Sequence, residues 1–196
     1  MSPVPAEPFP ARRLLLAGSG SIACADLPMW VTWIRQSLGI EVRILLTRRA
    51  RSLVSEAALA AISGHPVAHD SEAVAALASV PHQELASWGE AVLVAPATAN
   101  LVAKVAHGIA DDLLTTVLLA TERPVVLAPA LTPAMAAKPA TRRNLETLAD
   151  DGYGVVPTAR GFVASDGSVG EGAVADPPTA LAFLKRFMDK RALEAA

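Results

Sequence analysis

Cysteine is nearly absent from this sequence of 196 residues, in which Cys24 stands alone. A single thiol cannot form an internal disulfide, so cysteine usage does not reveal the redox compartment of the protein. The sequence also lacks a large excess of either charge, because 17 basic and 19 acidic residues leave a formal net charge of −2 and neither sign forms a long run. This balance argues against a nucleic-acid groove and against a polybasic membrane patch.

Long apolar runs are missing as well. No stretch approaches the roughly 18 uncharged apolar residues of a membrane-spanning helix, and residues 1–10 are rich in proline without the apolar core of a signal peptide. We therefore expect a cytoplasmic protein with no membrane contact, whose residues 1–12 form a flexible tail. Hydrophobic residues make up 52% of the chain, which is enough to form the core of one domain over residues 13–196.

Short apolar runs alternate along the chain with segments of helical periodicity. Unbroken apolar runs are typical of strands buried on both faces, and they predict strands at residues 14–17, 42–46, 91–95, 125–128 and 155–156. The periodic segments predict helices at residues 28–38, 56–62, 139–149 and 178–193, and two more within 100–120 that break near Gly108. The alternation indicates an α/β fold of three layers around a doubly wound parallel sheet, Rossmann-like or flavodoxin-like.

Such sheets bind ligands where their strands end, so the residues after each predicted strand form the candidate site. After the first strand the sequence reads Gly18-Ser19-Gly20-Ser21-Ile22. Its glycines permit a tight turn and its serines can donate to phosphate oxygens, although an ordinary strand-to-helix turn has the same composition. The turn lacks the third glycine of a dinucleotide-binding fingerprint and the lysine of a Walker A loop, so neither motif is predicted.

The other strand ends carry further candidates. Thr47 follows the second strand and either donates to a ligand or caps a helix. Residues 96–100 follow the third strand; their small side chains leave room for a flat ring, and Asn100 adds a donor and an acceptor. Residues 129–135 follow the fourth strand as a stiff loop with two prolines, which a purely structural turn would also resemble.

Two more segments are candidates for weaker reasons. Residues 108–116 read as a glycine break followed by an Asp-capped helix. His82 lies at the start of a predicted helix, and its context alone favours a surface or structural role over a catalytic one. The spacing of His, Cys, Asp and Glu indicates no metal site, and no GxSxG elbow indicates a hydrolase.

Taken together, these segments resemble the motifs of the homo-oligomeric flavin-containing cysteine decarboxylases. The first turn is similar to the GSIAA motif of that family, His82-Gln83-Glu84-Leu85 to its HxxL segment, and residues 96–101 to its PASANT motif. Residues 106–114 resemble its AxGIADxLL stretch, and residues 139–145 resemble the helix after its PxMNxxMW motif. The motifs occur in order over about residues 13–177. The family includes phosphopantothenoylcysteine decarboxylases and the epidermin- and cypemycin-type enzymes, which decarboxylate a C-terminal peptidyl cysteine.

The resemblance implies an enzyme that binds FMN between subunits of a homo-oligomer, a trimer or a dodecamer of trimers. It implies that the FMN phosphate and ribityl chain lie beside the first turn, Thr47 and Asn100, with the isoalloxazine near Ala97, Thr98 and Ala130. The implied cofactor-binding set is Gly18, Ser19, Gly20, Ser21, Ile22, Thr47, Pro96, Ala97, Thr98, Asn100, Asp111, Leu114, Thr115 and Ala130. The implied catalytic residues are Thr132, Met135 and His82, the last from a neighbouring subunit; Ser165, Gly167 and Gly170 belong to an implied substrate flap.

Two departures from the family pattern bear on the substrate. Thr132 stands where the family has an asparagine that is tied to holding the substrate carboxylate, and a hydroxyl offers only one donor. Ser165 stands where the coenzyme A enzymes of the family carry a cysteine that reduces the enethiol product. Peptide-modifying members stop at the enethiol, so Ser165 favours a peptide substrate with a C-terminal cysteine.

Three hypotheses follow from this resemblance. The first is an FMN-dependent peptidyl-cysteine decarboxylase of a modified-peptide pathway. The second is a phosphopantothenoylcysteine decarboxylase of coenzyme A biosynthesis, against which Ser165 speaks. The third is a non-catalytic FMN-binding or regulatory homologue, which Thr132 keeps open and the presence of His82 disfavours. A flavin prenyltransferase shares the expected fold but is poorly supported by residues 82–85 and 96–100.

Overall fold

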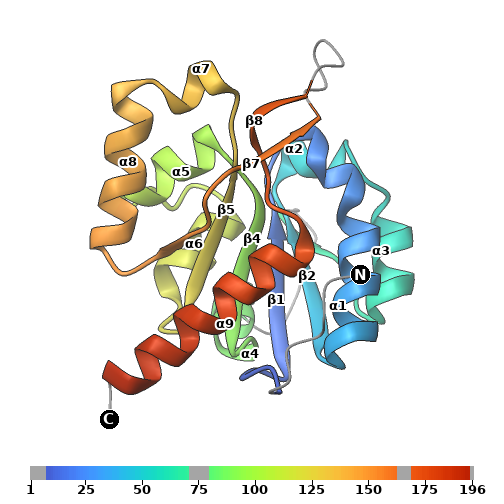
Figure 1. Ribbon diagram of the computed structural model, residues 1–196. Helices are drawn as coiled ribbons and strands as arrows, with labels where there is room; N and C mark the ends of the chain where they lie inside the picture. Colours follow the sequence, from blue (N-terminus) through green and yellow to red (C-terminus); the bar gives the residue numbers. More distant parts are fainter. Residues whose placement is uncertain (1–7, 71–79, 163–168, 195–196) are drawn as a thin grey trace.

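The computed structural model describes residues 8–70, 80–162 and 169–194. At its centre is a parallel sheet with the strand order β3-β2-β1-β4-β5-β6 (Figure 1). The strands are β1 (Arg13–Gly18), β2 (Glu41–Leu46), β3 (Ala68–His69), β4 (Ala91–Thr98), β5 (Val125–Ala130) and β6 (Gly154–Val155). All five predicted strands are confirmed. β3 was not predicted, because two residues are too few to give an apolar run.

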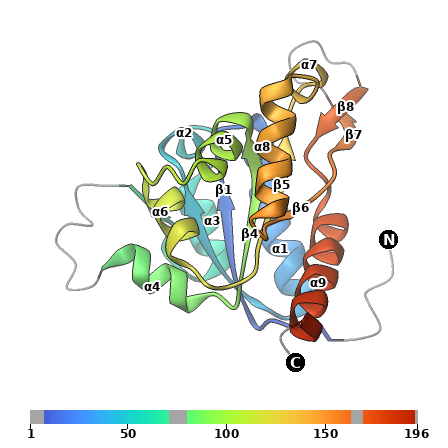
Figure 2. The same cartoon turned by 90° about the vertical axis from the view of Figure 1, so that its left-hand side faces the viewer.

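Helices cover both faces of this sheet, which confirms the three-layer prediction. Side chains alternate along a strand, so Leu14 and Leu16 of β1 enter one core cluster while Leu15 and Ala17 enter the other. The first face is covered by α1 (Leu27–Leu38), α3 (Glu56–Ser63) and α9 (Pro177–Glu194). The second is covered by α4 (Pro81–Trp88), α5 (Ala99–Ala106), α6 (Leu113–Ala120) and α8 (Pro139–Asp150). On this face α4 packs beside α6 and α5 beside α8 (Figure 2).

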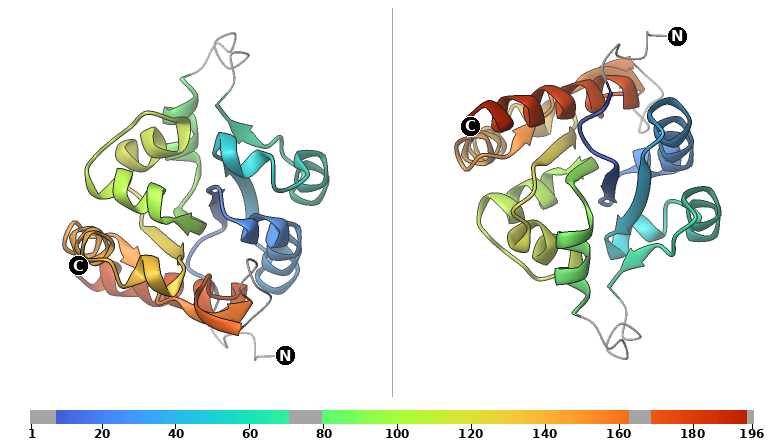
Figure 3. Two further views of the ribbon diagram at one scale, coloured as in Figure 1. Left: turned by 90° about the horizontal axis from the view of Figure 1, so that it is seen from above. Right: turned by 90° about the horizontal axis from the view of Figure 1, so that it is seen from below.

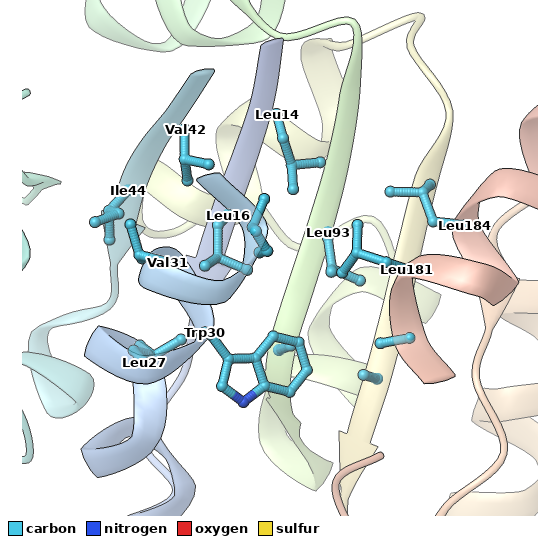
Figure 4. Packing of buried hydrophobic residues seen from close by; sticks show 14 of the residues in the cluster. Leu14, Leu16, Leu27, Trp30, Val31, Val42, Ile44, Leu93, Leu181 and Leu184 are labelled. Carbon is cyan, nitrogen blue, oxygen red and sulfur yellow. The ribbon is translucent and has the colours of Figure 1, made fainter. Parts of the chain in front are cut away.

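The core of the first face joins side chains from the strands β1, β2 and β4 with side chains from α1 and α9 (Figure 4). Trp30 of α1 is 4% exposed and belongs to the same cluster as Leu93 of β4 and Leu181 of α9. Burial of side chains this large contributes about 1.5–3 kcal/mol each, so the core holds the strand ends in place. Within the described part of the chain, no helix is both long and apolar enough to span a membrane.

Short polar signals set the helix ends. Ser55 caps α3 by accepting a hydrogen bond from Ala58 N, and Asp112 forms a capping box with Thr115 at the start of α6. The predicted break near Gly108 is confirmed, since Gly108 follows α5 with a φ of 64°. Helix termini therefore appear where capping residues and glycine predict them.

Residues 8–12 precede β1 and contact the rest of the fold. Ala11 is buried, and the backbone N of Arg12 donates to Glu90 Oε2 at 2.7 Å. That contact lowers the pKa of Glu90. The predicted tail of residues 1–12 lies outside the described residues for its first seven positions, and the domain boundary at residue 13 stays a prediction.

A second, antiparallel ribbon of β7 (Ala159–Phe162) and β8 (Val169–Ala173) lies beside the carboxyl end of β5, on the side of the sheet that α9 covers (Figures 2 and 3). The sequence predicted a glycine-rich flap over residues 161–172, with a disordered loop as the alternative, and it did not predict these strands. They are short and rich in glycine, so neither has the apolar pattern by which a strand is recognised.

Candidate functional site

The carboxyl ends of β1 and β4 lie side by side where the strand order reverses, which is where open α/β sheets bind ligands. Pairing between these strands ends at Ala17 and Val94, and the register of β4 against β5 shifts just beyond that point. Ser19 fills the space between the two strand ends and is 2% exposed. Its side chain belongs to the site rather than to the apolar core.

The Ser19 hydroxyl joins the two strand ends. Ser19 Oγ lies 2.9 Å from Pro96 O and accepts a hydrogen bond from Thr98 N at 2.8 Å. Ser19 N donates to Pro96 O at 3.0 Å. Every group in this network is paired, so the turn after β1 and the end of β4 hold one another in a fixed geometry.

Two threonines at the neighbouring strand ends cap short helices. Thr47 Oγ1 accepts from Ala50 N at 3.4 Å at the start of α2 (Arg48–Arg51), and Thr98 Oγ1 accepts from Leu101 N at 3.3 Å at the start of α5. The helix-cap alternative for Thr47 is therefore confirmed. A hydroxyl that accepts in this way keeps its own hydrogen for a ligand, so the ligand role remains compatible and stays a prediction.

These residues line one hollow at the carboxyl edge, with a cavity volume of about 500 Å³. It brings together six predicted residues: Ser19, Gly20, Thr47, Thr98, Asn100 and Asp111. It also contains residues outside the predicted cofactor-binding set: Arg48, Arg49, Asp70, Leu101, Lys104 and Asp112. Arg48 and Arg49 directly follow Thr47 at a strand end, and Leu101 and Asp112 lie within candidate segments of the sequence, so a local signal marked these four positions. Asp70 and Lys104 enter the hollow only through the order of the strands, and no local sequence signal could have found them.

Part of the negative charge in the hollow is paired within it. Lys104 Nζ lies 2.7 Å from Asp111 Oδ1 and 3.7 Å from Asp112 Oδ2. The hydrogen bond to Asp111 is the main reason that the pKa of Lys104 is raised above its ordinary value. Asp70 accepts from Leu113 N at 2.6 Å and so joins the end of β3 to α6.

A second, more open hollow of about 720 Å³ adjoins the first and shares Arg48, Asp70, Asp111 and Asp112 with it. Pro81 lines this second hollow, and the next residue, His82, is partly buried in the first turn of α4. The predicted helix start at His82 is confirmed. Its catalytic role, from a neighbouring subunit, stays a prediction.

The β5 side of the carboxyl edge carries the predicted substrate residues. Thr132 Oγ1 accepts from Met135 N at 3.2 Å and caps α7 (Pro133–Ala136); Thr132 is exposed, and Met135 is 48% exposed. Leu131 N donates to Gly172 O at 2.8 Å, which joins the loop after β5 to β8. Gly170 lies on β8, whereas Ser165 and Gly167 lie outside the described residues.

The remaining predicted cofactor residues lie near the hollow or behind it. Gly18 ends β1, Ser21 caps the 3₁₀ helix η1 (Ile22–Asp26), and Ile22 is 59% exposed. Pro96 and Ala97 are buried at the end of β4, and Ala130 ends β5. Leu114 and Thr115 are buried in α6, where Leu114 joins the core and Thr115 completes the capping box. Their observed contacts are structural, and their contact with a cofactor stays a prediction.

The hollow fits a phosphate-bearing ligand by two observations of its own. Gly20 has no side chain, so the turn after β1 lies against the stem of Arg49 and keeps this cation at the turn: a Cβ at Gly20 would come within 2.3 Å of Arg49 Cγ. Hydroxyls of Ser19, Thr47 and Thr98 and the cations Arg48 and Arg49 line the same space. In the described residues, no group of His, Cys, Asp and Glu side chains is arranged to hold a metal ion.

Comparison with known proteins places these features in a family. A family model described as Flavoprotein matches residues 5–189 of the chain. The "coenzyme A biosynthesis bifunctional protein CoaBC" of Vibrio vulnificus is 38% identical over 186 residues, which cover 93% of this chain and 45% of that protein. The chain therefore spans about half the length of the curated relatives it matches.

Two solved structures are similar over nearly the whole chain. The FMN-dependent cysteine decarboxylase SpaF superimposes with a TM-score of 0.75 at 34% identity, covering 90% of this chain and 97% of SpaF. A PPC decarboxylase mutant complexed with pantothenoylaminoethenethiol superimposes with a TM-score of 0.80 at 28% identity, covering 90% and 98%.

Proposed function

This chain belongs to the Flavoprotein family, and we propose that it is an FMN-dependent cysteine decarboxylase acting on a peptide that ends in cysteine. The observation that carries the proposal is the single hollow in which Ser19, Thr47, Thr98 and Asn100 meet at the reversal of strand order. It offers the hydroxyls of Thr47 and Thr98, which keep their hydrogens for a ligand, and the cations Arg48 and Arg49, which suit the ribityl chain and the phosphate of FMN.

FMN, when bound, supplies a two-electron acceptor that a plain cysteine lacks, and so makes loss of its carboxylate feasible. The protein has to position the substrate and move its protons. Thr132 Oγ1 already accepts from Met135 N, so its hydrogen is left to donate to the substrate carboxylate. His82, from the neighbouring subunit of a homo-oligomer, takes the thiol proton, since imidazole exchanges protons near neutral pH.

The assignment of a peptide substrate depends on the serine at position 165. A serine cannot form the disulfide by which a cysteine at this position reduces the enethiol in the coenzyme A enzymes that the chain resembles. The product is then an enethiol, together with carbon dioxide and the two hydrogens passed to the flavin. The cysteine decarboxylase SpaF, at 34% identity over 90% of the chain, supports this assignment at the level of the reaction.

A second candidate function is supported by a specific finding. The similarity to CoaBC, and to a PPC decarboxylase that binds pantothenoylaminoethenethiol, favours phosphopantothenoylcysteine as the substrate. The two candidates share the fold, the cofactor and the bond that breaks. They differ in what is attached to the reacting cysteine.

Product analysis distinguishes the two candidates. Purified protein with a visible flavin spectrum is incubated with peptides ending in cysteine, and separately with phosphopantothenoylcysteine, and the products are measured by mass spectrometry. We expect a peptide to lose carbon dioxide plus two hydrogens while phosphopantothenoylcysteine is turned over poorly. Efficient turnover of phosphopantothenoylcysteine with the peptides untouched would establish the second candidate instead.

Replacing the proposed acid–base residue tests the chemistry separately from cofactor binding. His82→Asn should retain bound flavin and lower turnover by about 10²–10⁴-fold, the usual contribution of a positioned acid or base. Gln83→Asn, a change at the adjacent exposed position, serves as the control and should remain active. A yellow, fully active His82→Asn protein would remove His82 from the reaction.

A further inference from the structure

The turn after β1 lies directly against the side chain of Arg49. A Cβ atom at Gly20 would come within 2.7 Å of Arg49 Cβ as well as 2.3 Å of Arg49 Cγ. Carbon atoms do not approach so closely without a shift, so the absence of a side chain at Gly20 allows the Arg49 stem to lie across the turn. The stem is therefore held on the same backbone that faces the hollow.

Hydrogen bonds also fix the backbone that carries Arg49. Thr47 N donates to Gly18 O at 3.1 Å and links the end of β2 to the end of β1. Ser52 Oγ donates to Arg49 O at 2.9 Å, and Arg51 N donates to Thr47 O at 3.2 Å. Arg49 thus has a fixed backbone and a constrained stem, although the residue as a whole is exposed.

The cations of the hollow differ in their partners. Lys104 is paired with Asp111 and Asp112, and Arg51, on the rim of the second hollow, is paired with Glu56. Over residues 8–70, 80–162 and 169–194, no carboxylate forms an ion pair with Arg48 or Arg49. The positive charge of Arg49 is therefore available to a ligand beside the Ser19–Gly20 turn.

We infer that Arg49 is a specificity residue that binds the phosphate of the flavin and makes the site select FMN over riboflavin. A guanidinium is permanently charged and its fork of N–H donors matches phosphate oxygens. Riboflavin carries only a neutral hydroxyl at that end, so it gains nothing comparable from Arg49. The inference rests on the proposed function, because it requires flavin in the hollow between β1 and β4.

The test compares two flavins on flavin-free protein by quenching of flavin fluorescence. Arg49→Gln should raise the Kd for FMN about 10-fold or more, as expected for a lost hydrogen bond to a charged group, and leave the Kd for riboflavin unchanged. Arg49→Lys keeps the positive charge but not the forked donors of the guanidinium, so its Kd for FMN should lie between those of the wild type and Arg49→Gln. Added salt should weaken FMN binding to the wild type more than to Arg49→Gln.

Controls separate this inference from the proposed function. Arg143→Gln removes the same charge from an exposed position on α8 and should bind both flavins as the wild type does. If Arg49→Gln bound FMN as tightly as the wild type, or lost affinity for both flavins equally, the assignment of Arg49 would be wrong. If the wild type bound neither flavin, the proposed function itself would be contradicted.

Discussion

The two sides of the carboxyl edge are held in different ways. Between β1 and β4, the Ser19 hydroxyl is buried and bonded to both Pro96 and Thr98, so side chains and backbone fix one another. Beyond β5, Thr132 and Met135 are exposed, and a backbone contact between Leu131 and Gly172 joins their loop to the ribbon of β7 and β8. The side between β1 and β4, which we call the cofactor side, is therefore held by several hydrogen bonds. The side beyond β5, which we call the substrate side, is held by few contacts.

The positions at which the sequence departs from the cysteine decarboxylase family lie mainly on the substrate side. The segment around Thr98 differs from the PASANT motif only by Thr98 for serine and Leu101 for threonine, and the turn at Ser19 and the residues near Asp111 stay close to the family pattern. Thr132 and Ser165, which depart from it, both belong to the predicted substrate side. Substitutions on the cofactor side disturb several hydrogen bonds at once, because each residue there has several partners. Substitutions on the substrate side affect fewer contacts and so preserve the fold.

Apart from replacement of His82, the largest expected effect comes from the junction between Leu131 and Gly172. Gly172 has a φ of 103°, and a Cβ there would come within 1.9 Å of Leu131 O. Gly172→Ala should therefore displace the loop that carries Thr132 and lower kcat/KM by about 10- to 100-fold, equivalent to about 1–3 kcal/mol of backbone strain. Flavin affinity should stay unchanged, as measured by fluorescence titration.

Gly152→Ala is the matched control for that change. Gly152 also has a positive φ, of 86°, but a Cβ there would meet nothing within 4 Å. Both variants should lose stability in thermal unfolding, whereas only Gly172→Ala should lose kcat/KM. Equal losses of activity would show that the junction does not position the substrate side.

The cofactor side is probed by Ser19→Ala. Removal of Ser19 Oγ leaves Thr98 N without its acceptor, which should lower the free energy of unfolding by about 1–3 kcal/mol and raise the Kd for FMN about 10-fold. Ser63→Ala is a suitable control, because Ser63 is equally buried but its hydroxyl contacts His65 at the end of α3. Ser63→Ala should lower the free energy of unfolding and leave the Kd for FMN unchanged. If both variants lost affinity for FMN, the effect of Ser19→Ala could not be assigned to the cofactor side.

A smaller effect is expected at Thr132. Thr132→Asn restores the residue of the resembled family and keeps a good helix cap, so it should lower KM by about fivefold, as about 1 kcal/mol from one added hydrogen bond allows. Thr132→Ser keeps both the hydroxyl and the cap, and its kinetics should match those of the wild type. A rise in KM for Thr132→Asn would indicate that the substrate carboxylate lies elsewhere.

The smallest effect concerns Cys24, whose thiol donates to Ser19 O at 3.1 Å on the cofactor side. Burial raises the pKa of this thiol to about 11 from 9.0. At pH 9 the folded protein should therefore hold roughly 50-fold less thiolate than the unfolded chain, and alkylation followed by mass spectrometry should be slowed at least that much. The stability that the neutral thiol contributes is complete below pH 9 and is lost as the pH rises from 9 to 11. Equally rapid alkylation of the native and unfolded protein would show that the turn opens readily.

The sequence predicted the sheet well because its strands are buried on both faces and read as unbroken apolar runs. The capping residues likewise predicted the break at Gly108 and the start of α6. β3, β7 and β8 escaped prediction because they are short or glycine-rich, and their pairing depends on distant strands. Within the hollow, Arg49 was passed over although it closely follows the second predicted strand, and Lys104 was missed since its place depends on how α5 stands beside β1. That arrangement is tertiary and leaves no local pattern.

The position of the flavin phosphate decides whether the hollow between β1 and β4 is the cofactor site. A crystal structure of the protein with FMN should show the phosphate beside the Ser19–Gly20 turn, between the ends of β1 and β4, with Thr47 and Arg49 around it. A phosphate bound at another edge of the sheet, or crystals that take up no FMN, would contradict the central claim.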